Sequence, residues 1–379
     1  MRFPEFHGEW DKCKLGDIAT GFDYGMNAPA KVFDGVNKYI RITDIDEASS
    51  TYNDSDIVSP DGTLTDTYLV NERDILLART GASTGKSYLY KKTDGKLYFA
   101  GFLIRANVPE HNPYFVFSQL HTHRYWKWVS IMSARSGQPG INSQEYSSFP
   151  IYTTSIQEER KISKLLSLLD ERIATQNKLI EKLESLIKGI VDCTILRKEK
   201  NAIVGDVCSI SEQIRAEANI DDIITVRLHG NGVCKSSAEN LQLGATQYYR
   251  RRAGQLIYGK QNFHNGAIGI VPISLDNGIT SKDIPSFDID EMKCNSVYLL
   301  AQLQSPQYYK PAEALTTGTS SKRLKEETFL KMPIVLPNKR EQDNIAVLIH
   351  RASMNLDHAK RLLELLSIQK QFLLRQMFI

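Results

Sequence analysis

The sequence predicts an α+β protein in which two mixed α/β globular units are joined by two long helices that form an antiparallel coiled coil. Two observations support this prediction. Apolar residues recur at alternating four- and three-residue steps through two stretches of about forty residues each, which is the spacing of a coiled-coil seam. Motifs in and around both stretches also recur at one fixed interval along the chain, which predicts a pseudo-twofold internal repeat.

The first seam lies between residues 156 and 196, and the second occupies the end of the sequence. Glu, Lys and Arg fill the outward positions, as on the solvent-facing side of a coiled coil. A helix with one apolar stripe needs a partner, and each stretch supplies one for the other. The seam residues are Ile162, Leu166, Leu169, Ile173, Ile180, Leu183, Ile187, Ile345, Ile349, Leu356, Leu363 and Leu366.

The repeat divides the chain into four parts. Phe149-Pro150-Ile151 recurs as Met332-Pro333-Ile334, and each copy stands just before a long helix. Residues 157–162 recur as 340–345 at the same interval. The predicted parts are a globular unit at 1–150, a long helix at 151–197, a second globular unit at 198–333 and a second long helix at 334–379.

Length and composition agree with this plan. A chain of 379 residues suits two domains and an extended element, and its apolar content of 41% is normal for a soluble protein. No run approaches eighteen apolar residues and the first residues lack the apolar stretch of a secretion signal, so we expect a cytoplasmic protein with no membrane partner. The five cysteines are scattered without a Cys-x-x-Cys pair, which favours free thiols over disulfides or zinc.

Charge is unevenly distributed in the first globular unit. Residues 1–75 hold 7 Lys and Arg against 15 Asp and Glu, whereas residues 76–150 hold 9 against 3. Aromatic residues, among them Tyr88, Tyr98 and Tyr125, are interleaved with the basic ones, as in a phosphate-contacting face. In the second unit the basic residues concentrate at 250–252 and 322–325. A solvated surface is the alternative interpretation of each cluster.

Short strand-like runs separated by turn residues dominate both globular units. In the first unit we predict strands at 38–42 and 74–79, a helix within 114–128 after Asn112-Pro113, and a loop at 133–148. In the second unit we predict strands at 223–228, 255–258 and 267–272, a helix at 297–309 and a loop at 316–325. Too few βαβ signals are present for a doubly wound sheet.

Two short motifs resemble parts of enzymes but differ from them in spacing or sequence. Gly81 to Ser87 has three residues between its glycines, whereas the phosphate-binding loop of nucleotide hydrolases has four. Asn112 to Phe115 lacks the second proline of the Asn-Pro-Pro-Tyr motif of amino-methyltransferases and is interpreted as a helix start. No histidine or carboxylate cluster has the spacing of a metal or nuclease site. We therefore predict a non-catalytic chain without a metal or cofactor of its own.

With two globular units, each followed by a helix that opens on Pro-Ile…Glu-(Glu/Gln)…Ile, the chain resembles the specificity subunit of a type I restriction-modification system. The resemblance covers essentially the whole chain. Residues 74–81 and 255–261 are similar to the variable target-recognition domains of that family. The resemblance implies that each unit reads one half of a split, asymmetric DNA sequence, that the helices set the spacing, and that catalysis belongs to partner subunits.

The resemblance also implies the partners. They are double-stranded DNA, two methyltransferase (modification) subunits and restriction or translocase subunits, with S-adenosylmethionine, ATP and Mg²⁺ expected on the partner subunits. An intramolecular seam buries one stripe of each helix, so further leucines on the outer faces are predicted to dock the methyltransferases. Those on the first helix are Leu165, Leu168, Leu179 and Leu186.

Arginine and amide side chains make bidentate contacts with base edges, so such residues in loops and at strand ends are candidate DNA contacts, together with nearby lysines and a histidine. The candidates are Arg41, Arg79, Lys86, Arg135, Gln138 and Asn142 in the first unit, and Arg227, Lys260, Gln261, His264, Lys322 and Arg323 in the second.

Connectivity predicts the distance between the two units. Only Arg197 to Ile203 join the first helix to the second unit, so the second helix must run back along the first. The units are then expected at opposite ends of the pair, about 60 Å apart at 1.5 Å per residue. That distance exceeds one turn of DNA, roughly 35 Å.

Two other functions remain open. A coiled-coil scaffold with no DNA role is compatible with the seams, because seams by themselves indicate only helix pairing. A P-loop-like nucleotide hydrolase would rest on Gly81 to Ser87. DNA binding that weakens steeply with salt separates the DNA-recognition function from both.

Overall fold

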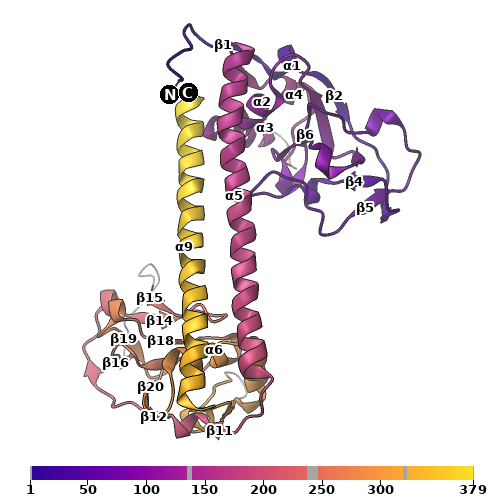
Figure 1. Cartoon of the computed structure of the whole chain (residues 1–379). Helices are drawn as coiled ribbons and strands as arrows, with labels where there is room; N and C mark the ends of the chain where they lie inside the picture. Colours follow the sequence, from indigo (N-terminus) through magenta and orange to yellow (C-terminus); the bar gives the residue numbers. More distant parts are fainter. Residues whose placement is uncertain (1, 135–138, 237–245, 319–321, 379) are drawn as a thin grey trace. The chain divides into compact units, whose positions relative to one another are not determined.

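The computed structural model describes residues 2–134, 139–236, 246–318 and 322–378, and the chain divides into two compact units. Unit 1 comprises Met1–Lys178 and Arg361–Ile379, and unit 2 comprises Leu179–Lys360. Each unit therefore holds one globular segment and one section of each long helix (Figure 1).

Unit 1 is built around a four-stranded antiparallel sheet in the order β2-β9-β6-β7. Side chains alternate across the central strand β6, so Ile75 and Leu77 enter one core while Leu76 and Ala78 enter another. The sheet strands are β2 (Thr20–Tyr24), β6 (Asp74–Ala78), β7 (Ser87–Leu89) and β9 (Leu103–Asn107). The smaller pairs are β1 (Asp11–Lys14) with β10 (Pro150–Thr153), β3 (Ala30–Val32) with β5 (Val58–Pro60), and β4 (Lys38–Ile40) with β8 (Leu97–Phe99). The short helices are α1 (Leu15–Ile18), α2 (Pro113–Gln119), α3 (His123–Ser133) and α4 (Ser143–Ser147).

Unit 2 contains a corresponding sheet in the order β12-β20-β17-β18. Its strands are β12 (Cys208–Ile210), β17 (Leu256–Tyr258), β18 (Ile268–Ile270) and β20 (Ser286–Ile289). The other strands are β11 (Ala202–Ile203) paired with β21 (Pro333–Ile334), β14 (Ile224–Val226) with β15 (Val233–Lys235), and β13 (Arg215–Ala216), β16 (Tyr248–Arg250) and β19 (Ile279–Ser281) in one sheet. The helices are α6 (Ser296–Leu303), α7 (Pro306–Tyr309) and α8 (Glu326–Leu330).

The internal repeat predicted from the sequence is present in the hydrogen bonds. The Asn112 side chain caps α2, and Asn295, its counterpart in the repeat, caps α6. Gln119 accepts a hydrogen bond from the backbone N–H of Tyr152, and Gln302 accepts one from Val335 at the same interval. The repeated sequence therefore encodes a repeated frame that ties the capped helix to the strand before each long helix.

Within the sheets the repeat runs at a slightly shorter interval. Asp74 accepts a hydrogen bond from the Asn71 N–H, and its counterpart Gln255 accepts one from the Arg252 N–H. The strand pairing agrees, because Ile75 lies opposite Leu89 as Leu256 lies opposite Ile270. Loops can lose residues without disturbing the strands that they join, so the sequence interval drifts while the sheet order is kept.

The long helices are α5 (Ile156–Val191) and α9 (Lys339–Met377). Inside unit 1 Lys370 of α9 pairs with Asp170 of α5 at 2.7 Å, and inside unit 2 Lys360 pairs with Glu184 at 2.8 Å. Residue numbers rise along one helix as they fall along the other, which confirms the predicted antiparallel pairing. Every predicted seam residue is buried or half-buried.

Three local predictions were wrong. The helix predicted at 297–309 is interrupted at Gln304 and Ser305 and forms α6 and α7. The helix predicted within 114–128 is broken into α2 and α3, because the Thr122 side chain accepts the Tyr125 N–H and begins a new helix. The stretch 133–148 was expected to be a loop but contains α4, which is stabilised by a capping box between Asn142 and Glu145. The N-terminal boundaries of α3 and α4 are each marked by a capping side chain, Thr122 and Asn142.

Candidate nucleic-acid interface

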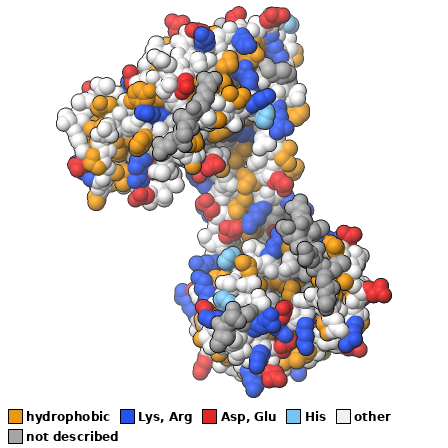
Figure 2. All heavy atoms as spheres, turned by 180° about the vertical axis from the view of Figure 1, so that it is seen from behind, with side chains coloured by type: hydrophobic (Ala, Val, Ile, Leu, Met, Phe, Trp, Pro, Cys, Tyr) orange, Lys and Arg blue, Asp and Glu red, His pale blue; other side chains and the backbone are white. Residues whose placement is uncertain are grey.

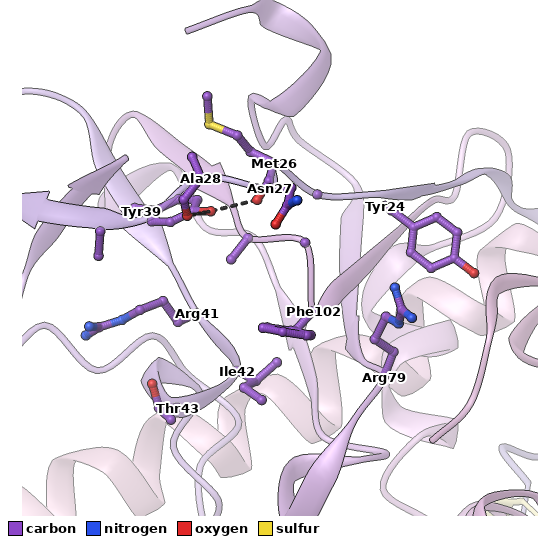
Figure 3. A pocket seen from close by; sticks show the side chains of 14 residues that line it. Tyr24, Met26, Asn27, Ala28, Tyr39, Arg41, Ile42, Thr43, Arg79 and Phe102 are labelled. Atoms are coloured by element: carbon purple, nitrogen blue, oxygen red, sulfur yellow. Dashed lines mark hydrogen bonds between the residues drawn. The ribbon is translucent and has the colours of Figure 1, made fainter. Parts of the chain in front are cut away.

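A hollow of about 650 Å³ opens on unit 1 where β6, the turn between β8 and β9, and the segment after β2 meet. Phe102, at the tip of the turn, lies between Arg41 and Arg79 (Figure 3). Its side chain is 58% exposed, and that of Tyr24, which also lines the hollow, is 41% exposed. An exposed aromatic ring beside arginines is suited to contact with nucleic acid bases.

Arg79 is held in place through its backbone. Its N–H donates to the Phe102 carbonyl at 3.0 Å, and its carbonyl accepts from the Ile141 N–H at 2.9 Å. The guanidinium lies over the Tyr24 ring, 4.6 Å from the centroid. The Tyr24 hydroxyl in turn accepts from the Ser143 N–H at 3.2 Å. Hydrogen bonding with the Ser143 side chain, together with this backbone bond, lowers the pKa of Tyr24 below its ordinary value. Arg79 makes no ion pair with any carboxylate in the described part of the chain.

The remaining candidates in unit 1 have partners within the protein or lie outside the described residues. Arg41 pairs with Asp44 at 2.8 Å and Asp56 at 3.1 Å, and these bonds raise its pKa. Lys86 pairs with Glu47 at 3.2 Å. Asn142 caps α4 and lines a second hollow of about 330 Å³ that Arg79 also lines. Arg135 and Gln138 lie outside the described residues.

Most candidates in unit 2 are likewise partnered. Lys260 pairs with Glu326 at 2.7 Å, Lys322 with Glu313 at 2.8 Å, and Arg323 with Asp283 at 3.4 Å. The remaining candidates are Arg227, whose Nε donates to the Cys234 sulfur at 3.1 Å, His264, which is half-buried beside Asn265, and Gln261, which is exposed. Lys and Arg side chains are interspersed with Asp and Glu on the visible face of each unit (Figure 2).

Two basic or aromatic groupings inferred from the sequence lie only partly on the surface, where Trp126, Arg250 and Arg252 are exposed. Tyr88, Tyr98 and Tyr125 lie in the core, because strand alternation and helix packing turn their rings inward. Arg251, from the cluster at 250–252, is also fully buried, and it donates to the Thr280 and Ser286 hydroxyls. Burial without a carboxylate partner among the described residues lowers the pKa of Arg251 to about 10.

The turn at Gly81 to Ser87 does not offer a phosphate cradle. The N–H groups of Gly81, Thr84, Gly85 and Lys86 donate to carbonyl oxygens of the protein at 3.0 to 3.1 Å. A phosphate-binding loop needs such amides free to face the ligand. This geometry disfavours the nucleotide-hydrolase alternative.

Comparison with known proteins is consistent with this picture. Residues 7–185 match the family model described as Type I restriction modification DNA specificity domain. The chain therefore resembles the type I DNA specificity family, and the matched segment makes up just under half of it. The match covers unit 1's globular segment and most of α5, and unit 2 repeats the sheet order of the matched segment. The family resemblance predicted from the sequence is thus confirmed.

Individual proteins of type I restriction-modification systems align along most of the chain. The type I restriction enzyme MjaVIII specificity subunit of Methanocaldococcus jannaschii is 21% identical over 384 aligned residues, covering 91% of this chain and 87% of that protein. The crystal structure of the type I restriction-modification system S subunit from M. genitalium shares the fold with a TM-score of 0.67 at 13% identity, covering 98% and 96% of the two chains. A chain from a structure on complex assembly and conformational transition of the type I R-M system gives a TM-score of 0.50 at 13% identity, covering 97% of each chain.

Two residues of the specificity domain were missed by sequence reasoning. Tyr24 and Phe102 line the main hollow, yet neither was a candidate. The sequence offered a weak signal in Gly101-Phe102, because a glycine before an aromatic residue between two strands is typical of a turn tip. Nothing local to Tyr24 marks it, since Arg79 reaches its ring only through the pairing of β2 with β9 and of β9 with β6.

The described part of the chain contains no helix that is long and apolar enough to span a membrane. No group of three or more histidine, cysteine or acidic residues positioned to hold a metal ion is found there either.

Proposed function

We propose that the chain is the DNA sequence-recognition subunit of a type I restriction-modification complex, in which each unit reads one half of a bipartite, asymmetric site. The main support for this proposal is that the two units share the same pattern of hydrogen bonds, at Asn112 and Gln119 in unit 1 and at Asn295 and Gln302 in unit 2. The exposed side chains carried on this shared pattern differ between the units. A repeated frame suits two halves at a set spacing, and different side chains suit two different half-sequences.

The helix pair then sets the spacer between the two halves. Two modules that each make modest contacts gain affinity together, because binding of the first raises the effective concentration of the second. Methylation and cleavage are assigned to partner subunits, which would supply S-adenosylmethionine, ATP and Mg²⁺.

Affinity for DNA is expected to fall steeply with salt and to need both half-sites. The complex with its methyltransferase is first used to map methylated sequences in cells, and duplexes carrying that site are then titrated between 50 and 200 mM salt. Six to ten phosphate contacts would weaken binding roughly 10³- to 10⁵-fold over that range. Scrambling either half alone should cost most of the specific affinity.

Two results would refute the proposed function. One is salt-insensitive or absent DNA binding by the complex. The other is methylation, cleavage or ATP hydrolysis by the purified chain alone, abolished by Lys86→Ala.

The helices are proposed to dock the methyltransferase subunits. On α5, Leu165, Leu168, Leu179 and Leu186 are 36%, 47%, 44% and 53% exposed, respectively. They follow one another at steps of three, eleven and seven residues, which place them on one side of a helix, away from the seam. Exposed leucines repeated along one side of a helix favour a protein partner over solvent.

Replacing Leu168 and Leu179 together by glutamate is expected to abolish co-purification with the methyltransferase, because two charges would be buried at the interface without partners. Ala174→Glu with Ser185→Glu is the matched control, since both positions are exposed on α5 and lie away from the leucines. Circular dichroism should show unchanged helicity in both variants. Normal association of the leucine variant would rule out docking on this face.

A further inference from the structure

Arg79 and Lys260 occupy the same place in the two units. The Lys260 N–H donates to the Asp283 carbonyl at 2.9 Å, and its carbonyl accepts from the Leu324 N–H at 2.9 Å. Arg79 makes the same two bonds with Phe102 and Ile141, which are the repeat counterparts of those two partners. The side chains of Arg79 and Lys260 therefore start from equivalent backbone positions in the two units.

The surroundings of the two side chains differ. Unit 1 has Ser143 where unit 2 has Glu326, which pairs with Lys260 at 2.7 Å. Unit 1 has the exposed Phe102 where unit 2 has Asp283, which is paired with Arg323. Among the residues that the structure describes, unit 1 thus presents an arginine without a carboxylate partner beside an apolar ring, whereas the charges of unit 2 are paired with one another.

The geometry of Arg79 fits one kind of base contact. Its planar guanidinium matches the N7 and O6 acceptors of guanine, and contact with the Tyr24 ring restrains its position before DNA arrives. Arg41, the other arginine lining the hollow, already pairs with Asp44 and Asp56. The Phe102 ring, between the two arginines in Figure 3, is suited to apolar contact with a thymine methyl group.

We propose that Arg79 reads a guanine in the half-site bound by unit 1, that Phe102 contacts the methyl group of a neighbouring thymine, and that Lys260 does not read guanine. This inference rests on the proposed function and adds the base chemistry of one half-site.

The test pairs atom changes in the DNA with side-chain changes in the intact complex. Each guanine of the mapped site is replaced in turn by 7-deazaguanine, which lacks the N7 acceptor. At one guanine the unmodified complex should lose about fivefold or more in affinity. Arg79→Ala should bind natural DNA roughly ten- to a hundredfold more weakly and be insensitive to the replacement at that guanine.

Lys260→Ala is the matched control, because it removes the repeat-equivalent cation and should retain full sensitivity to 7-deazaguanine. Arg79→Lys keeps the charge without the planar guanidinium and should lose most of the guanine preference while retaining salt-dependent binding. Replacing thymine by uracil beside that guanine should weaken binding by the unmodified complex and leave Phe102→Ala unaffected.

The inference and the proposed function fail in distinguishable ways. If the unmodified complex binds no DNA, the proposed function is wrong. If it binds specifically and Arg79→Ala keeps every 7-deazaguanine sensitivity, or if the half-site bound by unit 1 contains no guanine, the guanine assignment is wrong and the proposed function stands. Alanine preserves both backbone hydrogen bonds of Arg79, so the melting temperature of this variant should stay close to that of the unmodified chain.

Discussion

Methylation is expected to move to sites whose halves lie about three base pairs farther apart when one heptad is inserted into each long helix. Seven residues at 1.5 Å each add about 10 Å to a helix, and B-DNA rises about 3.4 Å per base pair. Insertion after Gln176 and after Ala359 uses repeat-equivalent points and preserves the four- and three-residue steps of both seams. The half-site sequences should not change, because the globular segments are untouched.

Affinity should also fall in the lengthened protein. Three base pairs rotate one half-site by about 100° relative to the other at 10.5 base pairs per turn, and either the DNA or the helix pair must twist to follow. Sequencing methylated sites in cells that carry the lengthened chain measures the change. Two results would contradict the hypothesis that the length of the helix pair sets the spacer. One is methylation that persists at the original spacing, and the other is half-sites that change while the spacer does not.

A heptad in α5 alone is the control for register. It would move the residues on one side of the insertion past their partners in α9, so either Asp170 and Lys370 or Glu184 and Lys360 would no longer meet. This variant should lose methylation at both the old and the new spacing.

Glu159→Leu is expected to destabilise unit 1 by about 1–3 kcal/mol. The fully buried Glu159 carboxylate accepts from the Asn112 N–H at 2.7 Å and bonds His111 at 2.8 Å. Leucine would leave both without this partner. Both groups are half-buried, and an unsatisfied group that is shielded from solvent costs about 1–3 kcal/mol. Asn112 also caps α2, so the loss would reach the helix that supports the sheet.

Glu159→Gln is the control that the repeat itself supplies. Gln342 stands at the equivalent position of unit 2 and accepts from the Asn295 N–H at 2.9 Å. A glutamine amide can therefore fill this role, and Glu159→Gln should cost within about 1 kcal/mol. Urea unfolding followed by tryptophan fluorescence reports on unit 1, because Trp10, Trp126 and Trp128 all lie there. Equal stability of the leucine and glutamine variants would show that the network does not stabilise the unit.

The features that depend on regular spacing of residue types were predictable from the sequence. The seams of α5 and α9 and the repeat at Asn112 and Asn295 follow from residue types at fixed spacing, which packing then enforces. Ranking the candidate DNA contacts was not possible in the same way. The sequence shows that Arg41, Lys86 and Lys260 are positively charged. It does not show that folding pairs each of them with a carboxylate.

The sequence by itself determined the two-unit plan, the antiparallel helix pair and the family resemblance, because periodicity and recurrence depend only on the order of residues. Tertiary structure alone decided which side chains are available to a ligand. Strand pairing brought Tyr24 beneath Arg79, a turn exposed Phe102, and burial removed Arg251 from the surface. Availability depends on neighbours that are distant in sequence, and so no local pattern encodes it.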